Sequence, residues 1–207
     1  MIEKYLWKSV AFAAVVSIAN VSPSFADVSL EGPIKTSQNF EENVSVTIPE
    51  GASAGTHAVD MNGQGKTFTM KDGTTLTIVY DKPDLPEYPS QSNYIGIKAS
   101  YGGQVEVDKV DMDIAYGGAV YVSGSTGAPS KVVIGDDSVI NVREGFGVLA
   151  NGSSSELHIG DNLELTVNNA PGGTSAVDAS WGASITVGDN ANISLVDGAY
   201  GSQVRPG

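Results

Sequence analysis

Three segments of the chain repeat one pattern of apolar and polar positions. They are residues 131–142 (KVVIGDDSVINV), 156–167 (ELHIGDNLELTV) and 184–195 (SITVGDNANISL). In each segment aliphatic residues alternate with mostly polar ones, Gly-Asp and a further polar residue follow, and the alternation resumes. A period of two places every second side chain on one face of a β-strand. The pattern therefore predicts two strands per segment, each with one buried face, joined by a sharp turn.

Two earlier segments fit the same pattern. Residues 67–78 (TFTMKDGTTLTI) fit without a gap, and residues 105–114 (VEVDKVDMDI) fit with one residue fewer at the turn. The apolar residue before the turn thus recurs five times, at Met70, Val107, Ile134, Ile159 and Val187. A second short apolar strand precedes each copy, at residues 58–63, 95–100, 119–124, 147–152 and 176–181. A unit of strand, turn, strand, Gly-Asp turn, strand and turn is typical of one coil of a parallel β-helix.

The repeated Gly-Asp element has a structural interpretation. The chain must bend between two strands that both bury alternate side chains. Glycine reaches positive φ without a Cβ clash, while Asp and Asn tolerate the left-handed region and bond their own backbone. Stacked coils require the same turn at each level, so we predict structural turns at Gly135, Asp136, Gly160, Asp161, Gly188 and Asp189. Ca²⁺ binding by these acids is a less favoured alternative, and we expect no cofactor.

The first 26 residues have the features of a secretory signal peptide. Lys4 and Lys8 precede an apolar stretch at residues 10–19, Pro23 interrupts it, and Ser24-Phe25-Ala26 resembles a cleavage site. A membrane anchor is the alternative, but the stretch is shorter than the roughly 20 residues that a spanning helix needs. We therefore expect residues 1–26 to be removed, residues 27–49 to form an amino-terminal cap with a first strand, and residues 50–207 to form the β-helix.

Two regions interrupt the predicted coils. Residues 81–93 (DKPDLPEYPSQSN) contain three prolines, which cannot donate to a β-ladder, so this segment is predicted to leave the β-helix as a loop. It is either a harmless insertion or an interaction loop, whose candidate residues are Pro83, Pro86, Tyr88 and Pro89. The last residues (VDGAYGSQVRPG) resemble the start of a further coil. We therefore expect an incomplete last coil and a chain that is part of something longer.

Charge and composition narrow the function. The chain has 207 residues and a formal net charge of −13, which argues against nucleic acid as a partner. It has no cysteine, so thiol catalysis is excluded, and its two histidines, His57 and His158, are far apart in sequence. The outward residues expected on the short strands form a column of Asp60, Lys98, Tyr121, Leu149 and Asp178, which includes charges of both signs. Within it, Asp60 and Lys98 are expected to form a surface pair. This column favours a non-enzymatic protein.

The units 119–142 (AVYVSGSTGAPSKVVIGDDSVINV) and 176–195 (AVDASWGASITVGDNANISL) resemble the passenger domains of bacterial autotransporters. The resemblance implies an all-β, right-handed parallel β-helix of the pectin-lyase-like type, here of about five to six coils of roughly 25 residues. It also implies export in a Gram-negative bacterium and display at the cell surface or in the outer membrane, or release outside the cell, by a carboxyl-terminal translocator barrel. No such barrel follows residue 195, which suggests an amino-terminal fragment.

Three functions stay open at this point. The first is an exported passenger without enzymatic activity, serving in adhesion, in host or surface interaction, or as a structural stalk. Its partner would be a host or bacterial surface protein or glycan. The second is a polysaccharide-active β-helix enzyme resembling pectate lyase, which would need a cluster of carboxylates with a basic partner. The third is a truncated, non-functional remnant of an autotransporter.

Overall fold

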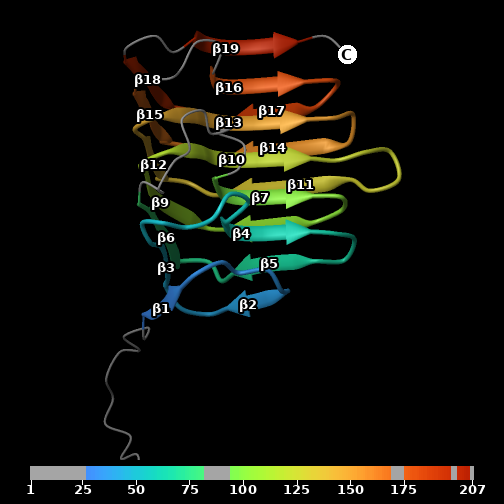
Figure 1. Cartoon of the computed structure of the whole chain (residues 1–207). Coiled ribbons are helices and arrows are strands. Elements are labelled where there is room, and N and C mark those ends of the chain that lie inside the picture. The colour runs from blue at the N-terminus through green and yellow to red at the C-terminus, as the bar shows by residue number, and fades with distance from the viewer. Residues whose placement is uncertain (1–26, 82–93, 169–174, 197–199, 206–207) are drawn as a thin grey trace, which may run out of the picture.

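The computed structural model describes residues 27–81, 94–168, 175–196 and 200–205, and every regular element in these ranges is a β-strand (Figure 1). The strands form three sheets, in which all neighbouring strands run parallel. We call them sheets A, B and C. This confirms the prediction of an all-β protein built from parallel strands, and the topology is consistent with a parallel β-solenoid.

Sheet A has seven strands and sheets B and C have six each. Sheet A contains β1 (Val28–Glu31), β3 (Val44–Ile48), β6 (Thr75–Tyr80), β9 (Lys109–Ile114), β12 (Val139–Val142), β15 (Glu164–Asn168) and β18 (Asn192–Val196). Sheet B contains β4 (His57–Asn62), β7 (Ile95–Ser100), β10 (Gly117–Ser123), β13 (Gly145–Asn151), β16 (Ser175–Ser180) and β19 (Tyr200–Arg205). Sheet C contains β2 (Gln38–Phe40), β5 (Thr67–Met70), β8 (Gln104–Val107), β11 (Ser130–Ile134), β14 (Ser155–Ile159) and β17 (Ser184–Val187).

The chain visits the sheets in a fixed cycle. From β4 to β18 each turn contributes one strand to sheet B, then one to sheet C, then one to sheet A. Strands that are neighbours within a sheet are therefore one turn apart in sequence, as Figure 1 shows by the gradual change of colour along each sheet. A strand whose partners lie one turn away cannot be stable alone, so the turns stabilise one another as in other solenoids.

The strand register confirms the sequence repeat. Val107, Ile134, Ile159 and Val187 are successive partners in sheet C, each at the end of its strand. The register also reveals an earlier copy that the sequence pattern did not, because Phe40 of β2 pairs with Met70 of β5. Residues 38–48 are thus a sixth occurrence of the pattern, in which residues 41–43 replace the Gly-Asp turn.

Within the segment 27–49, strand β3 lies in sheet A, where Val44 and Val46 pair with Leu76 and Ile78. This is the place that the third strand of each later turn occupies. The apolar residues of β3 have the same phase as those of β6, so burying them requires this register.

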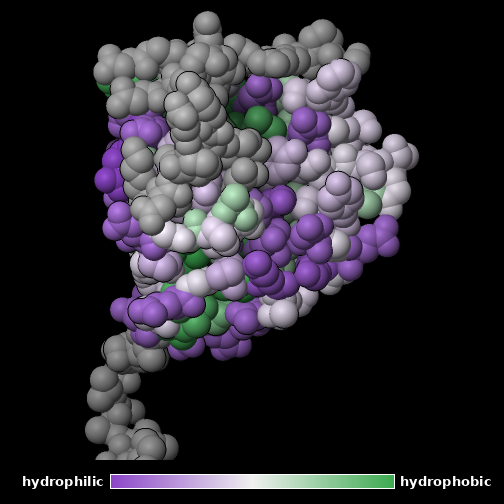
Figure 2. All heavy atoms as spheres, viewed as in Figure 1, coloured by the Kyte–Doolittle hydropathy of each residue, from purple (hydrophilic) through white to green (hydrophobic). Residues whose placement is uncertain are grey.

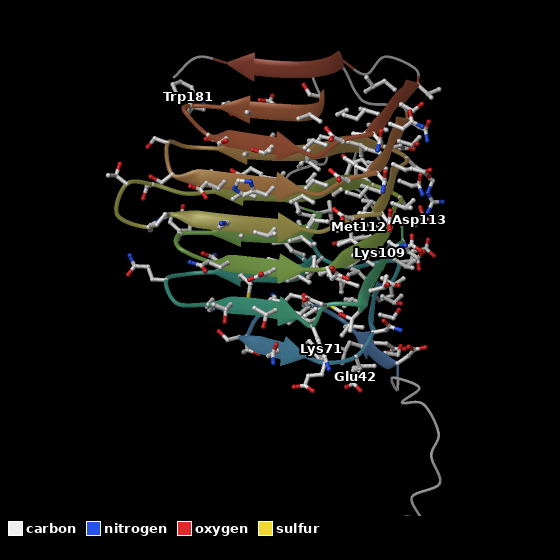
Figure 3. All side chains as sticks on the ribbon, turned by 180° about the vertical axis from the view of Figure 1, so that it is seen from behind. Glu42, Lys71, Lys109, Met112, Asp113 and Trp181 are labelled. Carbon is white, nitrogen blue, oxygen red and sulfur yellow. The ribbon has the colours of Figure 1, made fainter. Side chains whose placement is uncertain are left out.

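The core is the space between the three sheets. Apolar residues at alternate strand positions fill it, and their polar neighbours face outward: in β9, Met112 is fully buried while Asp113 is exposed (Figure 3). Three tyrosines extend this packing, since the rings of Tyr80, Tyr94 and Tyr116 meet edge to face at centroid distances of 6.0 and 5.8 Å. Such stacked rings add to the stabilisation that burial of apolar area provides.

Several predictions concern residues outside the described ranges. The predicted signal peptide at residues 1–26 is one, and the proline-rich segment with Pro83, Pro86, Tyr88 and Pro89 is another. At the other end, β19 adds a strand to sheet B beside β16. The part of the chain that the structure describes contains no helix with the length and hydropathy needed to cross a membrane.

Candidate functional site

The outward residues of sheet B form the column that the repeat predicts. Asp60 pairs with Lys98, Lys98 with Tyr121, Tyr121 with Leu149, and Leu149 with Asp178. All five side chains are at least partly buried. The sequence therefore placed these residues correctly, and charged groups of both signs lie on the first two strands of the column.

His57, the first residue of β4, joins this column and is the residue that sequence reasoning missed. Lys98 Nζ lies 3.1 Å from His57 Nε2, so Lys98 contacts the histidine of the preceding turn. Asp60 and Lys98 are strand partners, as the expected pair requires, but the contact of Lys98 is with His57, and Oδ1 of Asp60 is buried without a hydrogen-bond partner in the described structure. The position of this histidine, three residues before the outward Asp60, is the sequence feature that could have indicated its place in the cluster.

The environment of His57 keeps its ring neutral. Burial, with a further contribution from the Lys98 ammonium, lowers the pKa of His57 to about 4, although Asp60 acts in the opposite direction. With Lys98 donating to Nε2, the ring proton must reside on Nδ1. Nδ1 is itself buried and has no hydrogen-bond partner in the described structure. A neutral imidazole held by an ammonium is thus the central feature of the cluster formed by His57, Asp60 and Lys98.

This cluster is poorly placed for contact with a large substrate. His57 is only 3% exposed, and the nitrogen that would accept a proton already accepts a hydrogen bond from Lys98. A general base must reach the proton that it removes, either directly or through one water molecule. The cluster supplies residues of the right chemical kind but not an open surface on which a polymer could lie.

The Gly-Asp turns stack along the edge between sheets C and A. We call residues 71–74, 108, 135–138, 160–163 and 188–191 the acidic edge. Oδ1 of Asp136 accepts a hydrogen bond of 2.7 Å from the backbone N–H of Asp161, and Oδ1 of Asp161 accepts one of 2.7 Å from Asp189. Each aspartate therefore binds the backbone of the next turn, rather than its own backbone as predicted.

The glycines of these turns also have a role other than the predicted one. The residues with positive φ are Asp137, Asn162 and Asn190, at 55°, 60° and 58°, and not the glycines two positions earlier. Glycine is required there because adjacent turns lie in close contact. A Cβ on Gly160 would lie 2.1 Å from Oδ1 of Asp136, and one on Gly188 would lie 2.3 Å from Oδ1 of Asp161.

The acidic edge uses its oxygens internally. Besides the aspartate bonds, Asn162 Nδ2 donates to Oδ1 of Asp137 at 2.8 Å, and Asn190 Nδ2 donates to Oδ1 of Asn162 at 3.3 Å. No group of three or more His, Asp or Glu side chains suited to holding a metal ion occurs within the described residues. The hydrogen bonds therefore explain the aspartates of this edge as residues that link one turn to the next.

The outer face of sheet C carries the second histidine. His158 faces outward, as predicted, and its Nε2 lies 3.6 Å from Glu156, which also lies 3.9 Å from Lys131. A shallow hollow of about 190 Å³ lies nearby and is lined by Thr67, Thr69, Gln104, Val105, Glu106, Lys131 and Val133. These exposed pairs contribute little to stability.

Comparison with known proteins identifies no relative. The chain matches no protein-family model, no curated protein and no solved structure.

Proposed function

We propose that the chain is a non-enzymatic exported protein of the autotransporter passenger type, which serves in adhesion or surface interaction or as a structural stalk. Its fold would be a right-handed parallel β-helix of about five to six coils. The observation that carries the proposal is the register of three parallel sheets, in which backbone hydrogen bonds link successive turns and Asp side chains add links between the last three Gly-Asp turns. Such a stack presents outward residues at fixed spacings on a rigid body.

Further features support export and a binding role. Residues 1–26 have the charge and hydropathy pattern of a signal peptide, and the chain has no cysteine that could oxidise during passage through an envelope. The best cluster of titratable groups in the described structure is closed by burial and by the Lys98–His57 contact. Surface display would depend on a translocator barrel.

The proposal is tested by producing the chain in a Gram-negative host and determining the amino terminus of the recovered protein by mass spectrometry. We expect processing after Ala26 and recovery outside the cytoplasm. Latex beads coated with purified protein should then adhere to bacterial or host cell surfaces more than beads coated with heat-unfolded protein. Unprocessed cytoplasmic protein would contradict export, and equal adherence of the two bead types would contradict the binding role.

A polysaccharide-active enzyme is the second candidate, and the observation that favours it is the gathering of a histidine, a carboxylate and an ammonium in the cluster of His57, Asp60 and Lys98. Incubation with polygalacturonate, followed by absorbance of unsaturated products and by a reducing-end assay, measures lyase and hydrolase activity. The binding role predicts neither. Turnover that Lys98→Ala abolishes would establish the enzyme in its place.

A further inference from the structure

The edge between sheets B and C differs from the rest of the molecule in charge. We call residues 62–66, 101–103, 124–129, 151–154 and 181–183 the neutral edge. These five segments contain no Asp or Glu, although the chain carries a net charge of −13, and Lys66 is their single charged residue. Gly, Ser, Thr, Asn and Gln make up most of the rest. In Figure 2 the upper part of this edge, at the right of the view, is accordingly pale.

Two aromatic side chains project from the neutral edge. Tyr101 is 69% exposed and Trp181 is 64% exposed, whereas the aromatic rings of the core are buried or partly buried. Figure 3 shows Trp181 at the outer end of the edge, turned away from the body of the protein. Aromatic rings of this size are usually buried, so an exposed pair on a single edge calls for an explanation.

The backbone at both residues is unfavourable for an aromatic side chain. Tyr101 and Trp181 have φ of 51° and 57°, and each precedes a glycine with positive φ. Both turns close in the same way, with Gly103 N–H donating to Ser100 and Ala183 N–H donating to Ser180. Positive φ at two central positions favours Asn, Asp or Gly. Folding therefore does not require aromatic residues here, and the positive-φ sites of the acidic edge hold Asn, Asp or Gly.

The neutral edge holds the two rings at a fixed separation. Ser100, Ser123, Asn151 and Ser180 are successive partners in sheet B, so the strands before Tyr101 and Trp181 are three steps apart, or roughly 14 Å. Backbone bonds tie the levels together along the edge, because Tyr101 N–H donates to Ser123 and Gly152 N–H donates to Ser180. The rings therefore stand on a preorganised support.

Polar groups occupy the space between the two rings. Ser125, Thr126 and Ser153 are exposed on the intervening levels, and the loop that carries Ser125 and Thr126 is the one that projects furthest at the right of Figure 1. Gln64 Nε2 donates to the carbonyl of Gly127 in this loop at 2.8 Å, which anchors the loop to the level of β4 and β5. The edge thus offers hydroxyl groups between two aromatic platforms.

We propose that the neutral edge binds a neutral polysaccharide that lies along the solenoid axis and stacks on Tyr101 and Trp181. Sugar rings have apolar C–H faces that pack on aromatic rings, and their hydroxyls pair with uncharged donors and acceptors. An acidic polymer would meet a protein of net charge −13. A protein partner fits less well, because the two rings are separated by polar groups and form no continuous apolar patch. This inference rests on the proposed binding function and names its ligand class.

The test measures binding of the full chain carrying Trp7→Phe, so that Trp181 is the single tryptophan and its fluorescence reports on the edge. The probes are dextran, laminarin, galactomannan and xyloglucan, with polygalacturonate and heparin as acidic comparisons. We expect at least one neutral polymer to change Trp181 emission. Tyr101→Asn should raise its Kd about tenfold or more. Trp181→Asn, followed by affinity electrophoresis, should do the same.

The asparagine variants separate a ligand role from a structural one. Asn suits the backbone at both positions, so their melting temperatures should stay equal or rise while binding falls. Val196→Asn removes the exposed apolar residue on β18, in sheet A, and should leave binding unchanged. The inference is overturned if no neutral polymer binds, if acidic polymers bind equally well, or if Asn at 101 and 181 leaves Kd unchanged. Bead adherence that persists in these variants would retain the proposed function while rejecting this ligand.

Discussion

The acidic edge and the neutral edge lie on opposite sides of sheet C, and the chain turns differently at the two. At the acidic edge three successive turns use Gly, Asp and then Asp or Asn, and each turn bonds the next through an aspartate oxygen. At the neutral edge the turns vary in length and sequence, and backbone groups make most of the links between levels. The repeated residues are thus explained by folding, whereas Tyr101 and Trp181 are not.

The comparison of the two edges depends on the register of sheet C. The largest change in stability that we expect comes from a substitution that tests this register. Ile159→Asp places a carboxylate in the core, because Ile159 is 3% exposed, and should lower the free energy of unfolding by about 4 kcal/mol or more. His158→Asp, one residue away, points outward and should cost less than about 0.5 kcal/mol. Urea denaturation compares the two variants, and equal unfolding midpoints would contradict the register.

Burial of His57 makes the stability of the fold sensitive to acid. The pKa of His57 is lowered from 6.5 to about 4, so the unfolded chain binds more protons between these values. Its contribution, about 3 kcal/mol, is complete above pH 6.5 and is lost as the pH falls towards 4. Wild type and His57→Gln should therefore differ in the pH dependence of unfolding within this window. If the free energies of unfolding of the two proteins changed with pH in parallel, His57 would not be the source of the pH dependence.

Replacing one glycine at each edge compares how closely the turns of the two edges are packed. Gly160→Ala at the acidic edge brings a Cβ to 2.1 Å from Oδ1 of Asp136, and the resulting separation of turns should cost about 2 kcal/mol. Gly127 at the neutral edge has nothing within 4 Å of a built Cβ, and Gly127→Ala should change stability by less than about 0.5 kcal/mol. Thermal unfolding compares the pair. A larger loss for Gly127→Ala would reverse the distinction between a close-packed and an open edge.

The smallest expected effect is a gain in stability at the neutral edge. Trp181→Asn relieves a left-handed backbone position, which disfavours most L-residues by about 1–2 kcal/mol, and removes an exposed ring. We expect the variant to be more stable than wild type by about 0.5 kcal/mol. Differential scanning calorimetry measures this difference. A clear loss of stability would mean that Trp181 has a packing role and would weaken the distinction between the edges.

Much of the fold was predictable because its pattern is local. Alternation identified the paired strands around each Gly-Asp turn, and the outward column from Asp60 to Asp178 has the predicted register. The copy containing Phe40 escaped notice because Glu-Glu-Asn replaces Gly-Asp at its turn, so only the apolar spacing remained as a signal.

The candidate site was less predictable because it depends on contacts between turns. The sequence showed Asp60 and Lys98 as neighbours, but the choice of His57 by Lys98 follows from side-chain geometry and burial across β4 and β7. The role of Gly160 also follows from a contact with another turn, since its backbone conformation alone would admit other residues.

The sequence by itself determined which residues of each strand are buried, since a period of two leaves no other way to remove the aliphatic side chains from water. It also determined that the turns recur, because Gly, Asp and Asn are placed where successive strands must bend. Only the tertiary structure decided which turns lie one above another. Stacking separates an edge of linked aspartates from an edge without carboxylates, and brings Tyr101 and Trp181, 80 positions apart in sequence, onto the same edge.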